Sequence, residues 1–258
     1  MISVKKDGQW VEVPQLGSED IVSLNQGPLK FDFQVKFNLI NSTFLKYGVN
    51  AANYTTPTGT ISASLTMLWS QWFNGTENYM VLKGTRPRSV TVDLEIGKPI
   101  TATMDLIGMN IVDPSASAPA GITLQTAAPV GPVWDWISGG ANSVSWGGTA
   151  MDVKKFSVAI NRNTREDWTL GNLNPFSTQP HGRRIGWNFT NLWDSTGTLE
   201  GDWRAGASKT LAVVLKSATS TLTLTSNYLT NYNRDVDIGS DEAILEAVTG
   251  KSLSAAVT

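Results

Sequence analysis

The side chains of this chain that could carry out acid–base chemistry are few and poorly placed for it. His181 is the single histidine of the sequence, and it lies in a polar loop beside Arg183 and Arg184. Such a setting is more typical of a surface or interface group than of a general base. One histidine and no cysteine also leave too few ligands for a zinc site. We therefore expect no histidine-based catalysis and no zinc.

Two pairs of carboxylates remain as candidates for glycoside hydrolysis. Asp93 and Glu95 are two residues apart in a segment with strand-like alternation, and Glu166 precedes Asp167. Two positions along a strand place carboxylates near the spacing of about 5 to 9 Å that glycosidases use. Acidic residues on an exposed strand face are usually just solvated, so we expect no catalytic role for them.

Two further motifs resemble ion-binding loops and fail on spacing. The acidic run from Asp235 to Asp241 places Gly239 where a calcium loop needs a third oxygen ligand. The segment Gly201–Thr210 resembles a phosphate-binding loop, but Lys209 comes two residues too late, and the alternation after it predicts a strand instead of a helix. We expect no metal and no cofactor.

The composition narrows the class of protein further. The net charge is −2 and the isoelectric point about 5.5, so there is no basic field to attract nucleic acid. Charged residues make up 16% of the chain, below the usual ~25%, which suits a surface covered by copies of itself. We see no signal peptide and no apolar run near ~18 residues, so we expect a soluble, most simply cytoplasmic chain without a membrane partner.

The strongest structural signal is the alternation between residues 89 and 111. It predicts an antiparallel hairpin with a three-residue loop at residues 97–99, which would place Leu94 opposite Ala102 and Val92 opposite Met104. One face of this hairpin is apolar. The other face is polar and partly acidic, and it carries Thr91, Asp93, Glu95, Thr101, Thr103 and Asp105.

Further elements follow from the same periodicities. Alternation predicts strands at 30–39, 156–160 and 185–189, with two more near 209–215 and 219–225. Apolar residues at helical spacing predict a helix over 65–73 that packs on the sheet and ends at Asn74-Gly75, and a short helix is expected over 241–249. The packing stripe of the first helix consists of Leu65, Leu68, Trp69, Trp72 and Phe73.

The chain divides into an arm and one larger domain. Residues 1–29 are predicted to be an irregular, extended arm, and residues 30–258 a single domain. Polar loops are expected at 40–58 and 162–182. A proline-rich segment, 113–132, joins two halves, roughly 30–112 and 133–258, whose similar layout is consistent with an internal duplication.

The order of these elements resembles the tail tube proteins of long-tailed bacterial and archaeal viruses. The resemblance runs over roughly residues 56–227, and it is carried by residues 90–108, 146–167 and 184–206. It implies a mainly β fold, a tail-tube-like β-sandwich or rolled barrel with one packed helix and long loops. It also implies a structural virion protein, with no enzymatic activity, whose rings stack into a hollow tube for DNA.

The partners implied by the resemblance are other copies of the chain, in rings usually of six, together with tape measure and tail terminator proteins and, in a contractile tail, a sheath. Localisation would be the virion tail, after assembly in the host cytoplasm. We expect the strands of residues 89–96 and 99–106 to join neighbouring subunits, with their polar face lining the lumen or, alternatively, pointing outward. A trimer with pseudo-sixfold symmetry and a secreted or surface β-sandwich that binds glycans or proteins remain alternatives.

Overall fold

The structure is a computed structural model of the 258-residue chain. It describes residues 2–14, 21–49, 64–73, 75–115, 131–136, 143–180, 182–193, 197–216, 220–235 and 244–258. In this part of the chain a 13-stranded sheet is the main element, and its strands pair antiparallel. No helix among these residues is both long and apolar enough to cross a bilayer.

The main sheet has the strand order β1-β2-β5-β4-β9-β12-β15-β14-β13-β7-β8, with β3 and β6 pairing with β4 off this path. The pairing of β4 with β9 joins the two halves of the chain into one sheet. The strands span Ile2–Pro14 (β1), Ile21–Asn38 (β2), Leu65–Phe73 (β3), Thr76–Glu95 (β4), Thr101–Gly108 (β5), Asn110–Ser115 (β6), Val144–Trp146 (β7), Thr149–Met151 (β8), Val153–Asn161 (β9), Arg184–Leu192 (β12), Ser208–Lys216 (β13), Ser220–Asp235 (β14) and Leu245–Val257 (β15).

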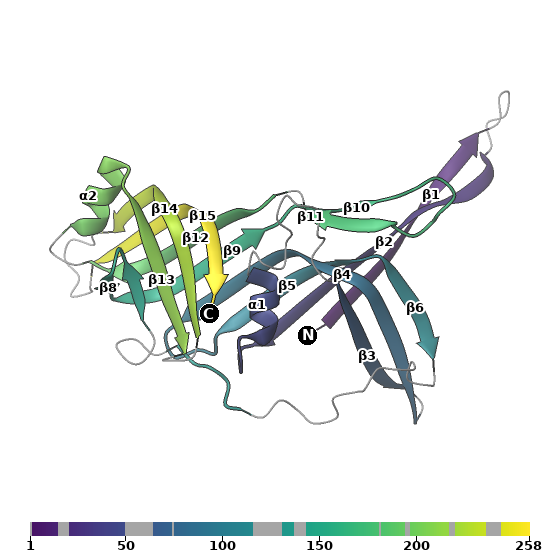
Figure 1. Cartoon of the computed structure of the whole chain (residues 1–258), viewed down its shortest axis with the longest axis horizontal. Coiled ribbons are helices and arrows are strands. Elements are labelled where there is room, and N and C mark those ends of the chain that lie inside the picture. Colours follow the sequence, from purple (N-terminus) through teal and green to yellow (C-terminus); the bar gives the residue numbers. More distant parts are fainter. Residues whose placement is uncertain are drawn as a thin grey trace.

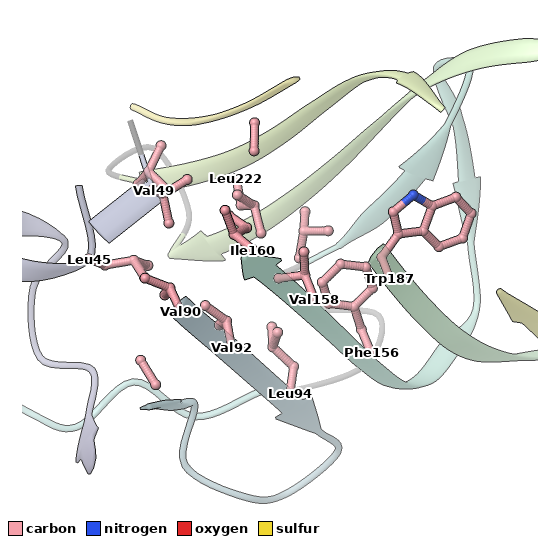
Figure 2. Packing of buried hydrophobic residues seen from close by; sticks show 14 of the residues in the cluster. Leu45, Val49, Val90, Val92, Leu94, Phe156, Val158, Ile160, Trp187 and Leu222 are labelled. Carbon is pink, nitrogen blue, oxygen red and sulfur yellow. The ribbon is translucent and has the colours of Figure 1, made fainter. Parts of the chain in front are cut away.

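The sheet curves so that its apolar face encloses one core. Alternate residues of each central strand are buried, as the period of two requires. Val92 of β4, Val158 of β9 and Trp187 of β12 belong to the same buried cluster as Leu222 of β14. Figure 2 shows these side chains converging on the space between the strands. Strands that lie far apart in the sheet order thus share one core, which is the arrangement of a rolled sheet.

One short helix, α1 (Thr43–Val49), packs on the inside of this curve, against β4 and β15 (Figure 1). Leu45 and Val49 are fully buried, and Figure 2 places them beside Val90. An Arg183 Nη1 donor bonds the carbonyl of Val49 at 3.1 Å, which places a positive charge at the negative end of the helix. The predicted loop at 40–58 is therefore wrong for residues 43–49, and residues 50–58 lie outside the described part.

The predicted helix at 65–73 is wrong, because this segment is strand β3. It pairs with β4, with Phe73 opposite Thr76 and Trp69 opposite Met80. Gly75, between the paired residues Phe73 and Thr76, has φ +76°, the left-handed backbone typical of a hairpin turn, so the predicted helix stop at Asn74-Gly75 is wrong; Asn74 itself lies outside the described residues. The predicted packing stripe of Leu65, Leu68, Trp69, Trp72 and Phe73 therefore belongs to a strand of a small sheet, β3-β4-β6, and to no helix.

The predicted helix at 241–249 is also wrong from Leu245 onward, where β15 begins. This strand pairs with β12 on one side and with β14 on the other. Hydrogen bonding along both edges overrides a local helical pattern of only a few residues. Residues 241–243, with the helix start and most of the acidic run 235–241, lie outside the described residues, as does His181.

The hairpin of β4 and β5 forms as predicted, but its register differs by two residues. Val92 lies opposite Ala102, and Val90 opposite Met104. The connection is longer because Ile100 donates its N–H to the carbonyl of Trp134 and so leaves the ladder with β4. A shift of two keeps every side chain on its predicted face, although Ile96 is 40% exposed at the turn. Each of the two paired segments also has a partner on its other side, β9 and β2 respectively.

The N-terminal arm is a β-hairpin, so the prediction of an irregular arm is wrong. β1 pairs with β2 from Ile2↔Val35 to Pro14↔Ile21, and Figure 1 shows this hairpin projecting from one end of the molecule. The predicted loop at 162–182 contains a second small hairpin, β10 (Thr164–Asp167) and β11 (Ser177–Pro180). Of the proline-rich segment 113–132, residues 113–115 belong to β6, and 116–130 lie outside the described residues.

A second helix that the sequence analysis missed, α2 (Thr198–Ala205), lies at the end of the molecule opposite the arm (Figure 1). Gly197 and Gly206 flank it in left-handed conformations, with φ +61° and +62°. Asp202 fixes it to the sheet: its carboxylate accepts a bond from Trp146 Nε1 at 2.7 Å and lies 2.6 Å from Lys209 Nζ. Lys209, the lysine of the rejected phosphate motif, is therefore engaged in an ion pair.

Candidate functional site

The outer face of the curved sheet carries rows of mainly polar side chains across six strands. Strand register aligns one residue from each of β2, β5, β4, β9, β12 and β15 in the longest rows. We call this surface the polar face. Its four rows are Asn38–Thr101–Asp93–Ser157–Asn188–Thr249, Lys36–Thr103–Thr91–Ala159–Gly186–Lys251, Gln34–Asp105–Ser89–Asn161–Arg184 and Glu95–Lys155–Thr190–Ala247.

The structure brings all six predicted polar residues onto this face. Thr91, Asp93 and Glu95 come from β4, and Thr101, Thr103 and Asp105 from β5, and none of them is buried. The members that β2, β9, β12 and β15 contribute were not predicted from the sequence. A signal for them was present, because β9 and β12 had been predicted from the same alternation, but the order in which distant strands pair was not.

The carboxylates of the polar face are held by neighbouring strands. Asp93 Oδ1 accepts a bond from Ser157 Oγ at 2.6 Å, across the β4–β9 pair. Asp105 accepts bonds from Gln34 Nε2, at 2.9 Å, and from Ser89 Oγ. Cross-strand pairs of this kind orient the side chains along the sheet and keep each carboxylate close to a donor.

Glu95 lies at the edge of this face in an ion pair. Its Oε1 is 2.6 Å from Lys98 Nζ, and Lys155 is its partner in the β4–β9 register. The hydrogen bond from Lys98 lowers the pKa of Glu95 below its ordinary value of 4.5, and the charges of Lys98 and Lys155 act in the same direction. These residues, with Asp93 and Thr101, surround a depression of about 340 Å³.

This geometry does not suit acid catalysis by Asp93 and Glu95. A glycosidase acid needs a pKa raised by burial, so that it still holds a proton near neutral pH. Glu95 has the opposite shift and is only partly buried, and Asp93 is exposed and bonded to Ser157. Among the described residues, no group of three or more His, Cys, Asp or Glu side chains is placed to hold a metal ion.

The charge of the polar face is mixed, because bases accompany the acids that were predicted from the sequence. Its acids come from the predicted hairpin, whereas the neighbouring strands contribute bases, of which Lys155 and Arg184 share a row with an acid. The acids are Asp93, Glu95 and Asp105, and the bases are Lys36, Lys155, Arg184 and Lys251.

A second surface feature is the loop of the β10–β11 hairpin, residues 168–176, which we call the hairpin tip. Leu170 is fully exposed, Phe176 is 67% exposed and Leu173 is 45% exposed. The tip is joined to β2 by a bond from the N–H of Leu29 to the carbonyl of Leu173, at 2.8 Å. Between Pro28 and this loop lies a hollow of about 480 Å³. Exposed apolar side chains gathered in one loop are typical of interaction surfaces.

The base of the same hairpin is fastened to the bend of β4. Thr164 Oγ1 donates to the carbonyl of Pro87 at 2.8 Å, and Thr178 Oγ1 donates to the carbonyl of Gly84 at 3.2 Å. Both threonines are buried. They supply donors at the place where β4 leaves the main sheet for the small sheet, so the base of the hairpin has a structural role.

Comparison with known proteins identifies the class to which this architecture belongs. The model of the phage tail tube protein family matches residues 17–252. The chain belongs to the phage tail tube protein family, and it is a structural protein of the virion tail that self-assembles into tubes. Of the two functions left open by the sequence, this membership favours the tube over the glycan-binding or protein-binding β-sandwich.

Two further comparisons add little to this assignment. A solved structure, Hcp1 from Flavobacterium johnsoniae, aligns with 45% of this chain and 93% of its own, at 17% identity and a TM-score of 0.31. No curated protein matches the sequence.

Proposed function

We propose that copies of this chain close into rings, that the rings stack into a hollow tube, and that the polar face lines the lumen through which viral DNA passes. The observation that carries this proposal is the polar face itself. It spans six strands, its four rows contain no large apolar side chain, and it lies opposite the buried core. The next residue on this side of β15, Leu253, is 70% exposed and marks the limit of the polar rows. A sheet with one dry and one hydrated face forms a wall between a packed interior and water.

The chemistry of the face suits transit of a polyanion without binding. A protein that binds DNA neutralises phosphates with clustered lysines and arginines. On the polar face the bases are interspersed with acids, as in the neighbouring Glu95 and Lys155, so no continuous basic track runs across it. Hydroxyl and amide groups between the charges keep the surface hydrated. DNA would then slide past a layer of water, and the chain would catalyse no reaction and require no cofactor.

The hairpin tip supplies a contact between rings. Leu170 and Phe176 expose apolar side chains to water. Burying each of them against an adjacent ring would stabilise the contact between rings by roughly 1.5 to 3 kcal/mol. The N-terminal hairpin, which projects from the same end of the molecule (Figure 1), is a second candidate for this contact.

The composition of the particle follows from this role. We propose rings of six subunits, with a trimer of internally duplicated chains as the alternative. The tube would meet a tape measure protein inside, a terminator protein at its end and, in a contractile tail, a sheath outside. Assembly would take place in the host cytoplasm. The arm of residues 1–29, the domain of residues 30–258 and the duplication of its halves remain part of this proposal.

Electron microscopy of the purified protein tests the proposal. The expected result is rings or hollow tubes of uniform diameter that form without DNA, nucleotide or any other added protein. A protein that stays monomeric across the micromolar to millimolar range, by light scattering as well as microscopy, would overturn it.

A further inference from the structure

The β4–β5 hairpin cannot be the seam between subunits. β5 pairs with β2 and β4, and residues 89–95 of β4 pair with β5 and β9, so both strands use their edges within the chain. A subunit that continues the sheet of its neighbour must offer a strand with one open edge. The described part of the chain has several candidates.

Most of these open edges carry features that hinder pairing with another strand. β8 has three residues. β6 contains Asp113 and Pro114, and a proline lacks the N–H that a ladder needs. β1 carries charges at Lys5, Lys6 and Asp7. Short length, prolines and charges are the means by which natural sheets prevent edge-to-edge association.

The edge of β3 lacks all of these features. Its nine residues, LTMLWSQWF, include no proline, no glycine and no charge. Among the described residues β3 pairs with β4 alone, so its other edge is open. A long uncharged edge of this kind is prone to pair with further strands. Because this chain assembles with itself, the available partner for the open edge is a strand from another copy of the chain.

We propose that the open edge of β3 pairs with a strand of a second copy of this chain and so forms the seam between neighbouring subunits. This inference rests on the proposed function and names the surface by which the ring closes. It also accounts for the composition of β3, since an uncharged edge is tolerated where a partner strand covers it.

The register of the hairpin identifies the backbone groups that form the seam. A two-residue loop makes its flanking pair, here Phe73 and Thr76, a hydrogen-bonded pair. Along β3 the N–H groups then alternate, so those of Phe73 and Gln71 face β4, and those of Trp72, Ser70 and Leu68 face away. Ser70 is the most suitable of these for substitution, because it is small and only partly buried.

The substitution Ser70→Pro removes one outward N–H and leaves the β3–β4 ladder intact, because a proline is tolerated on the solvent side of an edge strand. Ser70→Val keeps the N–H and is the matched control. Gln71→Pro removes an N–H that faces β4, so it is the control for disruption of the β3–β4 hairpin itself. We expect Ser70→Pro to fold like the wild type by circular dichroism and to lose tube formation where Ser70→Val retains it.

Hydrogen exchange supplies a readout that does not depend on a variant. In wild-type tubes the amides of residues 68, 70 and 72 should exchange at least tenfold more slowly than in unassembled protein. Equal exchange in both states, slow exchange already in the monomer, or normal tubes from Ser70→Pro would overturn the seam while leaving the tube itself established. A wild type that forms no tubes at all would instead overturn the proposed function, and the seam with it.

Discussion

Gly250 of β15 lies directly opposite Trp187 of β12, and the indole ring occupies the space that a side chain at position 250 would need. A Cβ added at Gly250 would lie 2.1 Å from Trp187 Cζ2 and 2.6 Å from Cη2. Trp187 is 1% exposed and belongs to the central core. The rolled sheet thus accommodates its largest side chain at this point by leaving the opposite residue without one.

The first prediction follows from this contact. Gly250→Ala should lower the free energy of unfolding by about 1 to 3 kcal/mol, because Trp187 must leave its rotamer or the strands must separate. Gly186→Ala is the matched control, since nothing lies within 4 Å of its added Cβ; its effect should stay within about 0.5 kcal/mol. Urea unfolding of unassembled protein measures both. Equal stability of the two variants would contradict the packing described.

The second prediction concerns the pH dependence of the ion pair between Glu95 and Lys98. Because the hydrogen bond from Lys98 lowers the pKa of Glu95 from 4.5 in the folded state, the pair contributes stability above pH 4.5. This contribution is lost as the pH falls through the folded pKa. The stability difference between the wild type and Glu95→Gln should therefore shrink in acid. In a Lys98→Ala background the difference should be smaller above pH 4.5 and change less with pH. A difference that grows in acid would contradict the assignment.

The third prediction concerns the polar face. Replacing both Asp93 and Glu95 by lysine adds positive charge beside Lys155, and a lumen lined in this way would attract phosphates. We expect such virions to assemble and to eject DNA more slowly, with the delay reduced at high salt. Asp152→Lys, at an exposed position off the polar face, is the control for charge alone. Failed assembly with normal ejection from the few particles formed would mean that the face points elsewhere.

The fourth prediction concerns the hairpin tip. Deleting the whole segment 162–182 would remove Thr164 and Thr178, which hold the bend of β4. The sharper change is therefore Leu170→Ser with Phe176→Ser, which leaves this base in place. Single rings should still form, and stacking should weaken by about 3 to 6 kcal/mol per subunit pair if both side chains are buried in the tube. Sedimentation separates rings from tubes, and tubes of normal length would exclude the tip as a stacking element.

The sequence predicted those parts of the fold in which local pattern and global pairing agree. Val90, Val92 and Leu94 alternate with polar residues, and the structure buries all three. The face of each hairpin residue was predictable even though the register was not. The N–H of Ile100 bonds the carbonyl of Trp134 instead of a residue of the hairpin. Local sequence patterns cannot predict a hydrogen bond to a residue 34 positions away.

The secondary-structure predictions are wrong where a sequence pattern fits both a helix and a strand, or where pairing with distant strands determines the structure. The run of Leu65, Leu68 and Trp69 matches a helical stripe, and the Asn74-Gly75 dipeptide that follows fits a helix stop as well as a hairpin turn. At Leu245, pairing along both edges of β15 prevailed over a short helical pattern. Only part of the candidate site could be predicted, for the same reason. Alternation placed Asp93 and Thr101 on one face of the hairpin, whereas Ser157 lies beside Asp93 because β4 pairs with β9.

The most direct measurement is a reconstruction by cryo-electron microscopy of tubes formed from the purified chain. We expect a hollow wall in which Thr91, Asp93 and Asn188 face the channel while Val92 and Trp187 lie inside the wall. A tube whose channel is lined by other strands, with the row from Asn38 to Thr249 on its outer surface, would contradict it.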